Sequence, residues 1–373
     1  MSINLSALKN VKLKSSKTKS QSRPKVTQLL CENTEQYTQL MKESFLEEYM
    51  EVINEYTFKS VTVDFPKEAA KEIMRCHKYW LEHHKDKEYD ANFFKESELL
   101  VELAKQFDEK KKKLTTENFF IRMSSRSPKD AALTSPKFKE EYTNAFQTIL
   151  ENDEKKNDQF SEKNTTINRK IHSLYIASVR ALSCKTGMEA IKLLIESKRI
   201  QGDLLQYAVE GLFELQFWLR EFHFFPVELE MRAFVYKKKL TALTQYNEFV
   251  YFPKIERNKS AIMEKVQNFV KQIIQEIPFQ NFVLDINPCF ENDNSPLLDE
   301  EKDFSQLKIY ICELNPLAEF AGSGCFDWVK DRDVLTGNSP FEFRIVEKPP
   351  QFGIQNIPET WKELIFENEE EKN

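Results

Sequence analysis

Two carboxylate–amide pairs are the residues of this chain best suited to chemistry. They lie in Asp285-Ile-Asn-Pro288 and in Glu313-Leu-Asn315-Pro, and each segment ends an apolar run. Side chains two residues apart in a strand share a face, so we expect each carboxylate to point the same way as its amide. The proline is expected to end the strand ladder. Carboxylate and amide oxygens are hard ligands, and two such strand ends predict a Mg²⁺ site.

The chain also places two cations where a predicted strand meets a turn. Apolar residues 119–121 lead into Arg122, and the turn Ser-Pro-Lys129-Asp follows shortly afterwards. Arginine and lysine bind phosphate oxygens through charge-assisted hydrogen bonds, so these cations suit the phosphates that Mg²⁺ carries. Together with the two carboxylate segments, they outline a nucleotide site built without a glycine loop.

Several other nucleotide and metal sites are not supported by the sequence. Only seven glycines occur in 373 residues, and none of them forms a GxxxxGK[ST] or GxGxxG motif, so neither a P-loop nor a Rossmann site is indicated. There is no Lys-x-Asp-Gly, so a covalent nucleotidyl-lysine ligase is not indicated either. The stretch with Cys76-His77 and His83-His84 is expected to be an exposed helix rather than a zinc site.

The composition is typical of globular proteins, with 31% charged and 40% hydrophobic residues, and the net charge of −6 gives no reason to expect nucleic acid binding. No apolar stretch approaches the roughly 20 residues needed to cross a bilayer, and no apolar signal-peptide core follows the N-terminus. The six cysteines are scattered in a chain large enough to fold without disulfides. We therefore expect reduced thiols, a cytoplasmic location and no membrane partner.

The order of the periodic segments predicts an α+β protein, with a helical N-terminal part followed by an antiparallel sheet. Helices are expected at 35–56, from Pro66 onward, and at 91–113, 137–152, 167–183, 187–197 and 256–276. Strands are expected at 118–123, 213–222, 228–236, 240–246, 281–286, 307–313 and 341–346. The three lysines between the third and fourth strands predict a hairpin turn.

The first arm of this hairpin alternates between charged and apolar residues. Glu228, Glu230 and Arg232 share one face, and four apolar residues share the other. Simple exposure of the charged face explains this pattern. A charged cleft explains it as well, because Arg232 lies in the middle of the strand rather than at an end.

The two ends of the chain are expected to differ in charge from the domain between them. Residues 1–31 contain seven cations and no acid, which predicts a disordered basic tail, with a docking helix or a targeting peptide as alternatives. Residues 32–355 are expected to form the folded domain, and residues 356–373 an acidic tail. The acidic insertion at 291–303 is expected to be an exposed loop, although contact with a basic partner is the alternative.

These segments, in this order, resemble the cell division cycle protein 123 family, members of the ATP-grasp fold group that help to assemble eukaryotic translation initiation factor 2. The resemblance covers roughly residues 50 to 350. It rests on seven segments, none of which is decisive alone: Tyr56-Thr-Phe-Lys-Ser60 with Pro66, Phe120 to Ala131, Lys185 to Leu204, Trp218-Leu-Arg220 with Pro226, Glu230-Met-Arg-Ala-Phe-Val235 with Thr244-Gln245, Asp285 with Glu313-Leu-Asn315-Pro316, and Phe326-Asp-Trp328.

The resemblance implies an ATP-grasp-like fold in which antiparallel sheet lobes enclose a nucleotide cleft. The ATP-binding residues that it implies are Arg122, Lys129, Trp218, Leu219, Arg220, Glu221, Arg232, Asp285, Glu313 and Asn315. The first two would contact the phosphates, residues 218–221 would be the hinge whose backbone meets adenine, and Arg232 would reach the γ-phosphate side. Asp285, Glu313 and Asn315 would hold Mg²⁺ between the phosphates.

The chain departs from the family's pattern at several positions beside this site. Arg122 stands where lysine is common, Ser124-Ser-Arg126 where Asn-Trp-Ser is usual, and Glu313 where aspartate is usual. Ala321-Gly-Ser-Gly324 replaces a Thr-Asp-Ser-Leu-type sequence, and Tyr246 stands where arginine is common. These departures predict a divergent member of the family and put its client protein in question.

Two functions are compatible with this sequence. The first is an ATP- and Mg²⁺-binding assembly chaperone that binds the γ subunit of translation initiation factor 2, without any need for turnover. The second is an ATP-grasp enzyme, a carboxylate–amine ligase or a phosphotransferase, for which Arg126 and the glycines at 322–324 would supply charge and room for a second substrate. A scaffold that has lost ATP is a third possibility, since a fold alone does not establish an activity. The protein is expected to be a monomer.

Overall fold

The computed structural model describes most of the chain, and its five described cysteines are free thiols. The described residues are 39–86, 89–156, 165–291, 295, 297–299 and 301–349. The predicted basic and acidic tails lie outside them, so those two predictions and the domain boundaries that they set stay predictions. No helix in the described ranges is long and apolar enough to cross a membrane.

Helices fill the first half of the described chain, and most strands follow in the second half. The α-helices are α3 (Met50–Ile53), α4 (Lys67–His83), α5 (Glu98–Lys111), α6 (Pro136–Lys156), α8 (Thr166–Arg180), α9 (Gly187–Glu196), α10 (Lys198–Ala208), α11 (Pro253–Arg257), α12 (Lys259–Ile273) and α13 (Arg332–Leu335). The strands are β1 (Ser60–Val63), β2 (Phe119–Met123), β3 (Phe217–Glu221), β4 (Met231–Tyr236), β5 (Lys239–Gln245), β6 (Phe282–Cys289), β7 (Lys308–Pro316) and β8 (Glu342–Arg344).

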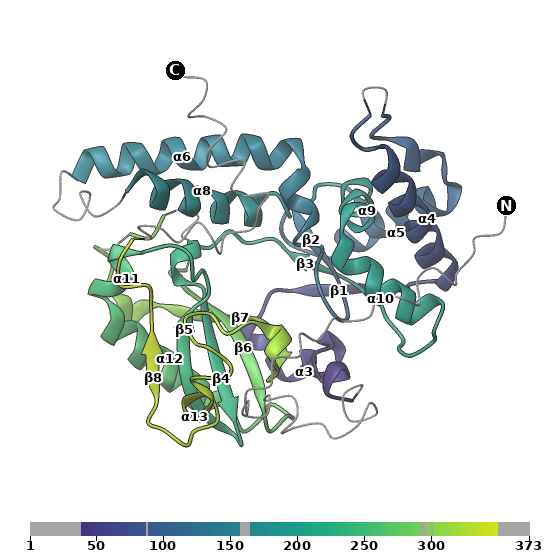
Figure 1. Cartoon of the computed structure of the whole chain (residues 1–373). Coiled ribbons are helices and arrows are strands. Elements are labelled where there is room, and N and C mark those ends of the chain that lie inside the picture. The colour runs from purple at the N-terminus through teal and green to yellow at the C-terminus, as the bar shows by residue number, and fades with distance from the viewer. Residues whose placement is uncertain are drawn as a thin grey trace, which may run out of the picture.

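The strands form two separate sheets, which confirms the predicted α+β class. One sheet has three antiparallel strands in the order β1-β3-β2, and the other has five in the order β7-β6-β4-β5-β8. The smaller sheet lies between the group of α4, α5, α9 and α10 and the larger sheet (Figure 1). The larger sheet is not wholly antiparallel as expected, because the edge strand β8 pairs with β5 in parallel.

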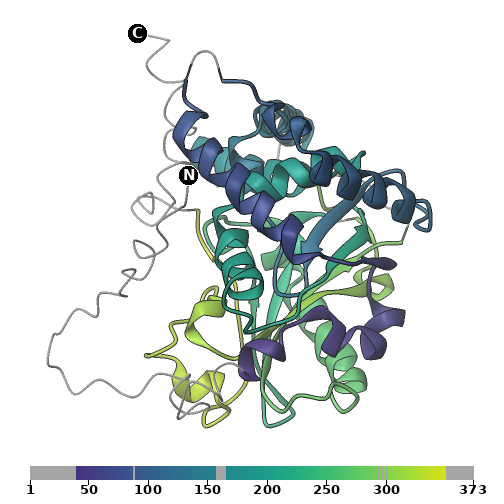
Figure 2. The ribbon, with the colours of Figure 1, turned by 90° about the vertical axis from the view of Figure 1, so that its right-hand side faces the viewer.

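Each face of the five-stranded sheet is covered by a different part of the chain. On one face, apolar residues of β4 and β6 join those of α8 and α12 in the largest hydrophobic core. On the other face, Phe234 and Val283 pack against a C-terminal segment that includes Phe326 and Trp328. Figure 2 shows this segment and α12 on opposite sides of the sheet. The second face is apolar only at that end, and its other end carries the charged side chains described below.

Two helices predicted as continuous are interrupted in the structure. The predicted helix 35–56 begins outside the described residues, and its described part breaks at Phe45, which is extended. There the Leu46 N–H donates to the Ser124 carbonyl over 3.0 Å, so a contact with the segment after β2 replaces a helical bond. The predicted helix 256–276 is divided at Asn258 into α11 and α12.

Other predictions about the strands were wrong. The short strand β1 was not expected, and the first hairpin arm begins at Met231 because residues 227–229 form a 3₁₀ turn. Strand β6 also continues through Pro288 to Cys289 instead of ending before the proline. Strand β4 pairs with β6 only as far as Ile286, so Pro288 lies where β6 is paired on one side, and its missing N–H is tolerated.

The stretch expected to be an exposed helix is a helix, but two of its residues are in the core. Cys76 and His77 of α4 are buried, and His77 Nδ1 lies 2.6 Å from the Ile195 carbonyl. The described residues contain no group of three or more His, Cys, Asp or Glu side chains that could hold a metal ion.

Close packing of α5 against α9 makes a specific prediction about Gly187, the first residue of α9. A Cβ at this position would lie 2.0 Å from the Ala104 carbonyl oxygen of α5, which is backbone that cannot turn aside. We expect Gly187→Ala to lower the free energy of unfolding by about 1–3 kcal/mol, the usual cost of overpacking. Urea unfolding measures this change.

Gly202, inside α10, provides the matched control, since a Cβ there would meet nothing within 4 Å. Gly202→Ala is expected to raise the free energy of unfolding by up to about 1 kcal/mol, because alanine favours the helix. Equal effects of the two substitutions would contradict the close approach of the two helices.

Candidate nucleotide-binding site

A cavity of about 390 Å³ lies between the two sheets. Its walls come from segments that are far apart in the sequence, namely the end of β2 and the turn after it, helix α8, the end of β3, the residues that follow β5, and strands β6 and β7. The residues used in the argument below that line it are Phe58, Arg122, Lys129, Arg199, Arg220, Glu221, His223, Phe225, Glu230, Tyr246, Asn287, Cys312 and Glu313.

Three charged side chains form a row across the larger sheet at one edge of this cavity. Arg232 of β4 lies opposite Asp285 of β6, and Asp285 lies opposite Glu313 of β7. The Arg232 guanidinium donates from Nε and Nη2 to the two Asp285 oxygens, each over 2.8 Å. Asn315 Nδ2 also donates to Asp285 Oδ2 over 3.1 Å. Both residues of the Arg232–Asp285 pair are buried, so simple exposure does not explain the charged face of the hairpin.

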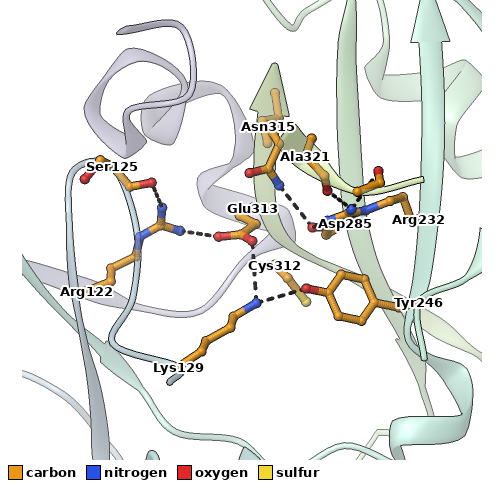
Figure 3. A network of polar contacts seen from close by, with 12 residues as sticks. Arg122, Ser125, Lys129, Arg232, Tyr246, Asp285, Cys312, Glu313, Asn315 and Ala321 are labelled. Carbon is orange, nitrogen blue, oxygen red and sulfur yellow. Dashed lines mark hydrogen bonds and ion pairs between the residues drawn. The ribbon is translucent and has the colours of Figure 1, made fainter. Parts of the chain in front are cut away.

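Two cations hold Glu313 from the opposite side. One lies in β2 and the other in the turn that follows it. Arg122 Nη1 donates to Glu313 Oε2 over 3.2 Å, and Lys129 Nζ lies 3.6 Å from Oε1 (Figure 3). Lys129 Nζ also lies 3.2 Å from the Tyr246 hydroxyl. The network therefore joins the β2 side of the cavity to strands β4, β5, β6 and β7.

The turn that carries Lys129 is fixed by the residue that follows it. Asp130 accepts hydrogen bonds from the Ser197 hydroxyl and from the Arg199 N–H, at 2.5 and 3.1 Å. These bonds connect the turn to the start of α10. The connection holds the lysine of the Ser-Pro-Lys-Asp turn at the wall of the cavity.

Burial and ion pairing act differently on the two carboxylates. Burial raises the pKa of Asp285, although the Arg232 guanidinium opposes this effect. Burial would also raise the pKa of Glu313, but Lys129, Arg122 and Arg232 together hold that pKa well below its usual range. Glu313 is therefore a permanent anion at neutral pH, and its charge attracts cations to the row.

A second row of side chains lines the cavity next to the first. The sequence predicted Asn287 there as the amide paired with Asp285 and gave Glu230 as part of a possible charged cleft, but it did not assign Tyr246 to the site. Glu230 and Asn287 lie one residue beyond the paired Met231 and Ile286 of β4 and β6, and Tyr246 donates its N–H to the Glu230 carbonyl over 2.8 Å. Asn287 is 5% exposed, and its Oδ1 has no hydrogen-bond partner among the described residues. The sequence carried a signal for these positions, because side chains two residues apart in a strand share a face. Glu230 and Asn287 each lie two residues from a member of the first row, and Tyr246 lies two residues from Thr244, which is next to that row on β5.

The far end of the cavity is aromatic. The Phe58 ring stacks on Phe225 and His223 at centroid distances of 5.6 and 5.9 Å, and on Tyr310 at 5.8 Å. The Arg220 guanidinium lies 4.9 Å from the Phe58 ring centre and donates to the Cys312 carbonyl over 2.8 Å. Burial, together with the neighbouring Arg122, lowers the pKa of Arg220 to about 10. This end of the cavity presents flat apolar surface and little charge that is available to a ligand.

Eight of the ten implied ATP-binding residues meet at this cavity. Arg122, Lys129, Arg220, Glu221 and Glu313 line it, and Arg232, Asp285 and Asn315 join it through the charged row.

Trp218 and Leu219 do not meet there. They are buried in the centre of β3, and their backbone is paired with β1 on one side and β2 on the other. Their N–H and C=O groups are therefore used by the sheet. The Glu221 N–H is used as well, since it donates to the Lys59 carbonyl over 2.9 Å, so this backbone is engaged within the protein.

The donor set at the charged row fits Mg²⁺. This ion takes octahedral oxygen ligands, commonly one or two protein carboxylates completed by phosphate oxygens and water. Asp285 and Glu313 are two such carboxylates on adjacent strands, and Asn315 contacts the first of them. All four carboxylate oxygens contact cationic side chains in the structure, so a bound metal would replace some of these contacts.

The fold and the site define an α+β protein with a charged row of side chains beside an aromatic cavity. A sequence profile of the D123 family matches residues 141–362, more than half of the chain. The chain therefore belongs to the D123 family, and the family resemblance inferred from its motifs is confirmed.

Two curated relatives are similar over shorter stretches. A putative CDC123-like protein of Acanthamoeba polyphaga mimivirus is 24% identical over 194 residues, which is 52% of this chain and 54% of the relative. A translation initiation factor eIF2 assembly protein of Xenopus laevis is 32% identical over 100 residues, which is 26% of this chain and 25% of the relative. The matched stretches thus span about half of one relative and a quarter of the other.

Two solved structures share the fold. They are Cdc123 from Schizosaccharomyces pombe and a C-terminally truncated form of it, with TM-scores of 0.54 and 0.55. Each is 15% identical in sequence, and each comparison covers 83% of this chain and 98% of the solved one. At this level of identity the likeness shows the fold.

The position of Glu230 predicts an unusual dependence of stability on pH. Burial raises the pKa of Glu230 to about 7, against the opposing effect of Lys129. A carboxyl whose pKa is higher in the folded state than in the unfolded state favours folding while it is protonated. This contribution to stability is complete below the unfolded-state pKa and is lost as the pH rises towards 7. Glu230→Gln is therefore expected to be more stable than the wild type at pH 8, by at most about 3 kcal/mol, with the advantage shrinking towards pH 4.5.

Denaturant unfolding between pH 4.5 and pH 8 measures this difference. The exposed Glu264 of α12 supplies the control, and Glu264→Gln should show no comparable gain with pH. A stability difference for Glu230→Gln that is constant across this range would contradict the raised pKa.

Proposed function

We propose that the protein binds ATP together with Mg²⁺ in this cavity and acts as an assembly factor for translation initiation factor 2. The observation that carries the nucleotide part is the pairing of Asp285 with Glu313 on adjacent strands, each held by cations from other elements. Carboxylates and cations held together in this way match a ligand that is itself a metal cation bound to phosphate anions.

Binding would exchange partners within the charged row. Mg²⁺ would take oxygens of Asp285 and Glu313, with Asn315 beside them, and the cations would turn to phosphate oxygens. Arg122, Lys129 and Arg232 already point toward this position. Each bond lost to a carboxylate is replaced by a charge-assisted bond to phosphate, which favours the exchange.

The rest of the cavity suits the rest of the nucleotide. Glu230 and Asn287 place two acceptors beside the charged row, where the ribose hydroxyls would follow the phosphates. The stacked rings around Phe58 form the far end, where a flat purine would lie. The charged row, the two acceptors and the aromatic rings thus follow the order in which ATP presents its phosphates, ribose and base, and this order supports the proposal.

The partner is proposed from the family and from one relative. The chain belongs to the D123 family, and the similar Xenopus laevis protein is named as an eIF2 assembly protein. We propose initiation factor 2, and specifically its γ subunit, as the partner, which would place the protein in the cytoplasm. The match covers a quarter of that relative, so a direct binding test must accompany the nucleotide test.

The enzymatic alternative loses the two features that favoured it. Arg126 is paired with Asp203 over 2.8 Å and is absent from the residues that line the cavity. Gly322 packs against Arg232, so the small-residue segment does not open room for a second substrate. The assembly function therefore needs fewer additional features than a ligase or a phosphotransferase.

Calorimetric titration with ATP, with and without Mg²⁺, tests the nucleotide part. The wild type should bind ATP more tightly with Mg²⁺. Asp285→Asn keeps the shape of the side chain but removes its charge, and it should cost at least about 2 kcal/mol, or roughly thirtyfold in affinity. Asp331→Asn is the control, because Asp331 pairs with Arg344 outside the cavity lining and should not affect binding. Equal affinity of Asp285→Asn and wild type would contradict the proposed metal site.

A pull-down with purified γ subunit of initiation factor 2 tests the partner separately. We expect the full chain to retain the subunit, with Mg²⁺ and ATP present, above the level retained by the resin alone. Absence of binding by a protein that binds ATP in the calorimeter would overturn the partner and leave the nucleotide site standing.

A further inference from the structure

Arg232 connects the charged row to a second structural element, the loop of residues 319–324. Two N–H groups of its guanidinium are bound to Asp285, as described above. The remaining nitrogen, Nη1, donates to the Ala321 carbonyl and, over 3.0 Å, to the Gly322 carbonyl (Figure 3). A guanidinium has five N–H donors, so four of them are in use and at most one remains free.

This count restricts what Arg232 can do when a ligand binds. To place two donors on a phosphate, or to leave Asp285 to a metal ion, Arg232 must give up part of its present bonding. The five donors are fixed in one rigid plane. Arg232 is also confined, because it is 7% exposed and lies 4.9 Å from the centre of the Tyr246 ring. Movement of Nε and Nη2 away from Asp285 therefore also moves Nη1 away from the loop carbonyls.

The loop is built to approach Arg232 closely. Gly322 has φ +75°, and a Cβ there would lie 2.9 Å from Arg232 Nη1, so both the backbone conformation and the available space favour glycine. After the loop, Cys325 donates its N–H to Thr244 Oγ1 over 3.1 Å, which anchors the chain on β5. Between its anchors the loop presents Phe320, whose side chain is 50% exposed.

We propose that Arg232 couples the nucleotide site to this loop, so that binding of Mg²⁺ and ATP releases the Ala321 and Gly322 carbonyls and shifts Phe320. This inference rests on the proposed nucleotide function and adds a form of regulation to it. An exposed aromatic side chain whose position depends on the ligand gives a protein partner a means to distinguish the two states, because a partner that contacts it binds one state better.

Hydrogen–deuterium exchange of the full chain, read by mass spectrometry, tests this coupling. We expect peptides covering residues 317–326 to exchange roughly tenfold to a hundredfold faster with Mg²⁺ and ATP, about the effect of one lost hydrogen bond to a charged donor. ATP with a chelator should leave the loop unchanged, since Asp285 then keeps Arg232. Peptides from α4, outside the cavity lining, serve as the internal reference.

Two alanine substitutions distinguish coupling through Arg232 from a general effect of backbone strain. Gly322→Ala pushes the loop away from Arg232, so exchange should be fast from the start and should not respond to the ligand. Gly337→Ala introduces a similar strain, at φ +70°, but its Cβ would contact Thr241 at 3.0 Å, and the response of the loop should be retained. Calorimetry fixes the ligand concentration at which each variant is saturated.

The outcomes distinguish this inference from the function on which it rests. ATP binding with an unchanged loop in the wild type would overturn the coupling and leave the nucleotide site standing. A full loop response in saturated Gly322→Ala would overturn the route through Arg232. No binding of ATP by the wild type would overturn the proposed function itself. If Gly322→Ala does not fold or bind, the wild-type comparison with and without Mg²⁺ decides.

Discussion

The adjacent carboxylates of Asp285 and Glu313, with the cations that hold them, are the interaction on which the other features of the site depend. Asp285 is buried and the Glu313 side chain is 16% exposed. Two such anions on neighbouring strands repel each other unless each has a cationic partner, and here the partners come from β4 and from the β2 side of the cavity. Removing one partner of a buried pair costs about 3–5 kcal/mol, whereas replacing the whole pair by apolar residues is often neutral. Stability alone therefore does not explain such a row, and this is the reason for proposing that it binds a ligand.

This constraint explains the position of the two sheets. The larger sheet supplies the anions, and the smaller sheet supplies Arg122 and, through the turn fixed by Asp130, Lys129. The same face of the larger sheet is apolar where the segment around Trp328 covers it and charged where it borders the cavity. Arg232 stands at the boundary and contacts both the row and the loop that begins the covering segment.

The sequence predicted the residues whose chemistry is local, and it missed those that only tertiary structure brings together. The carboxylate segments and the Ser-Pro-Lys-Asp turn were identified because charge after an apolar run is visible in the chain. Asn287 was predicted beside Asp285, whereas Tyr246 was not assigned to the site and Glu230 only as one of two alternatives, because their positions beside Asn287 depend on cross-strand register. Trp218 and Leu219 were assigned to a hinge, but only the structure shows that β1 and β2 both pair with their strand. The interruption of the predicted helix 35–56 just before Leu46 likewise depends on a tertiary contact, the hydrogen bond from the Leu46 N–H to Ser124.

A crystal structure with Mg²⁺ and a non-hydrolysable ATP analogue is the most direct test of the exchange of partners at Asp285 and Glu313. The account predicts a metal ion bound by both carboxylates, the phosphates contacted by Arg122, Lys129 and Arg232, and the base against the rings around Phe58. Asp285 still bound to Arg232 through both oxygens, with the nucleotide outside the cavity, would contradict it.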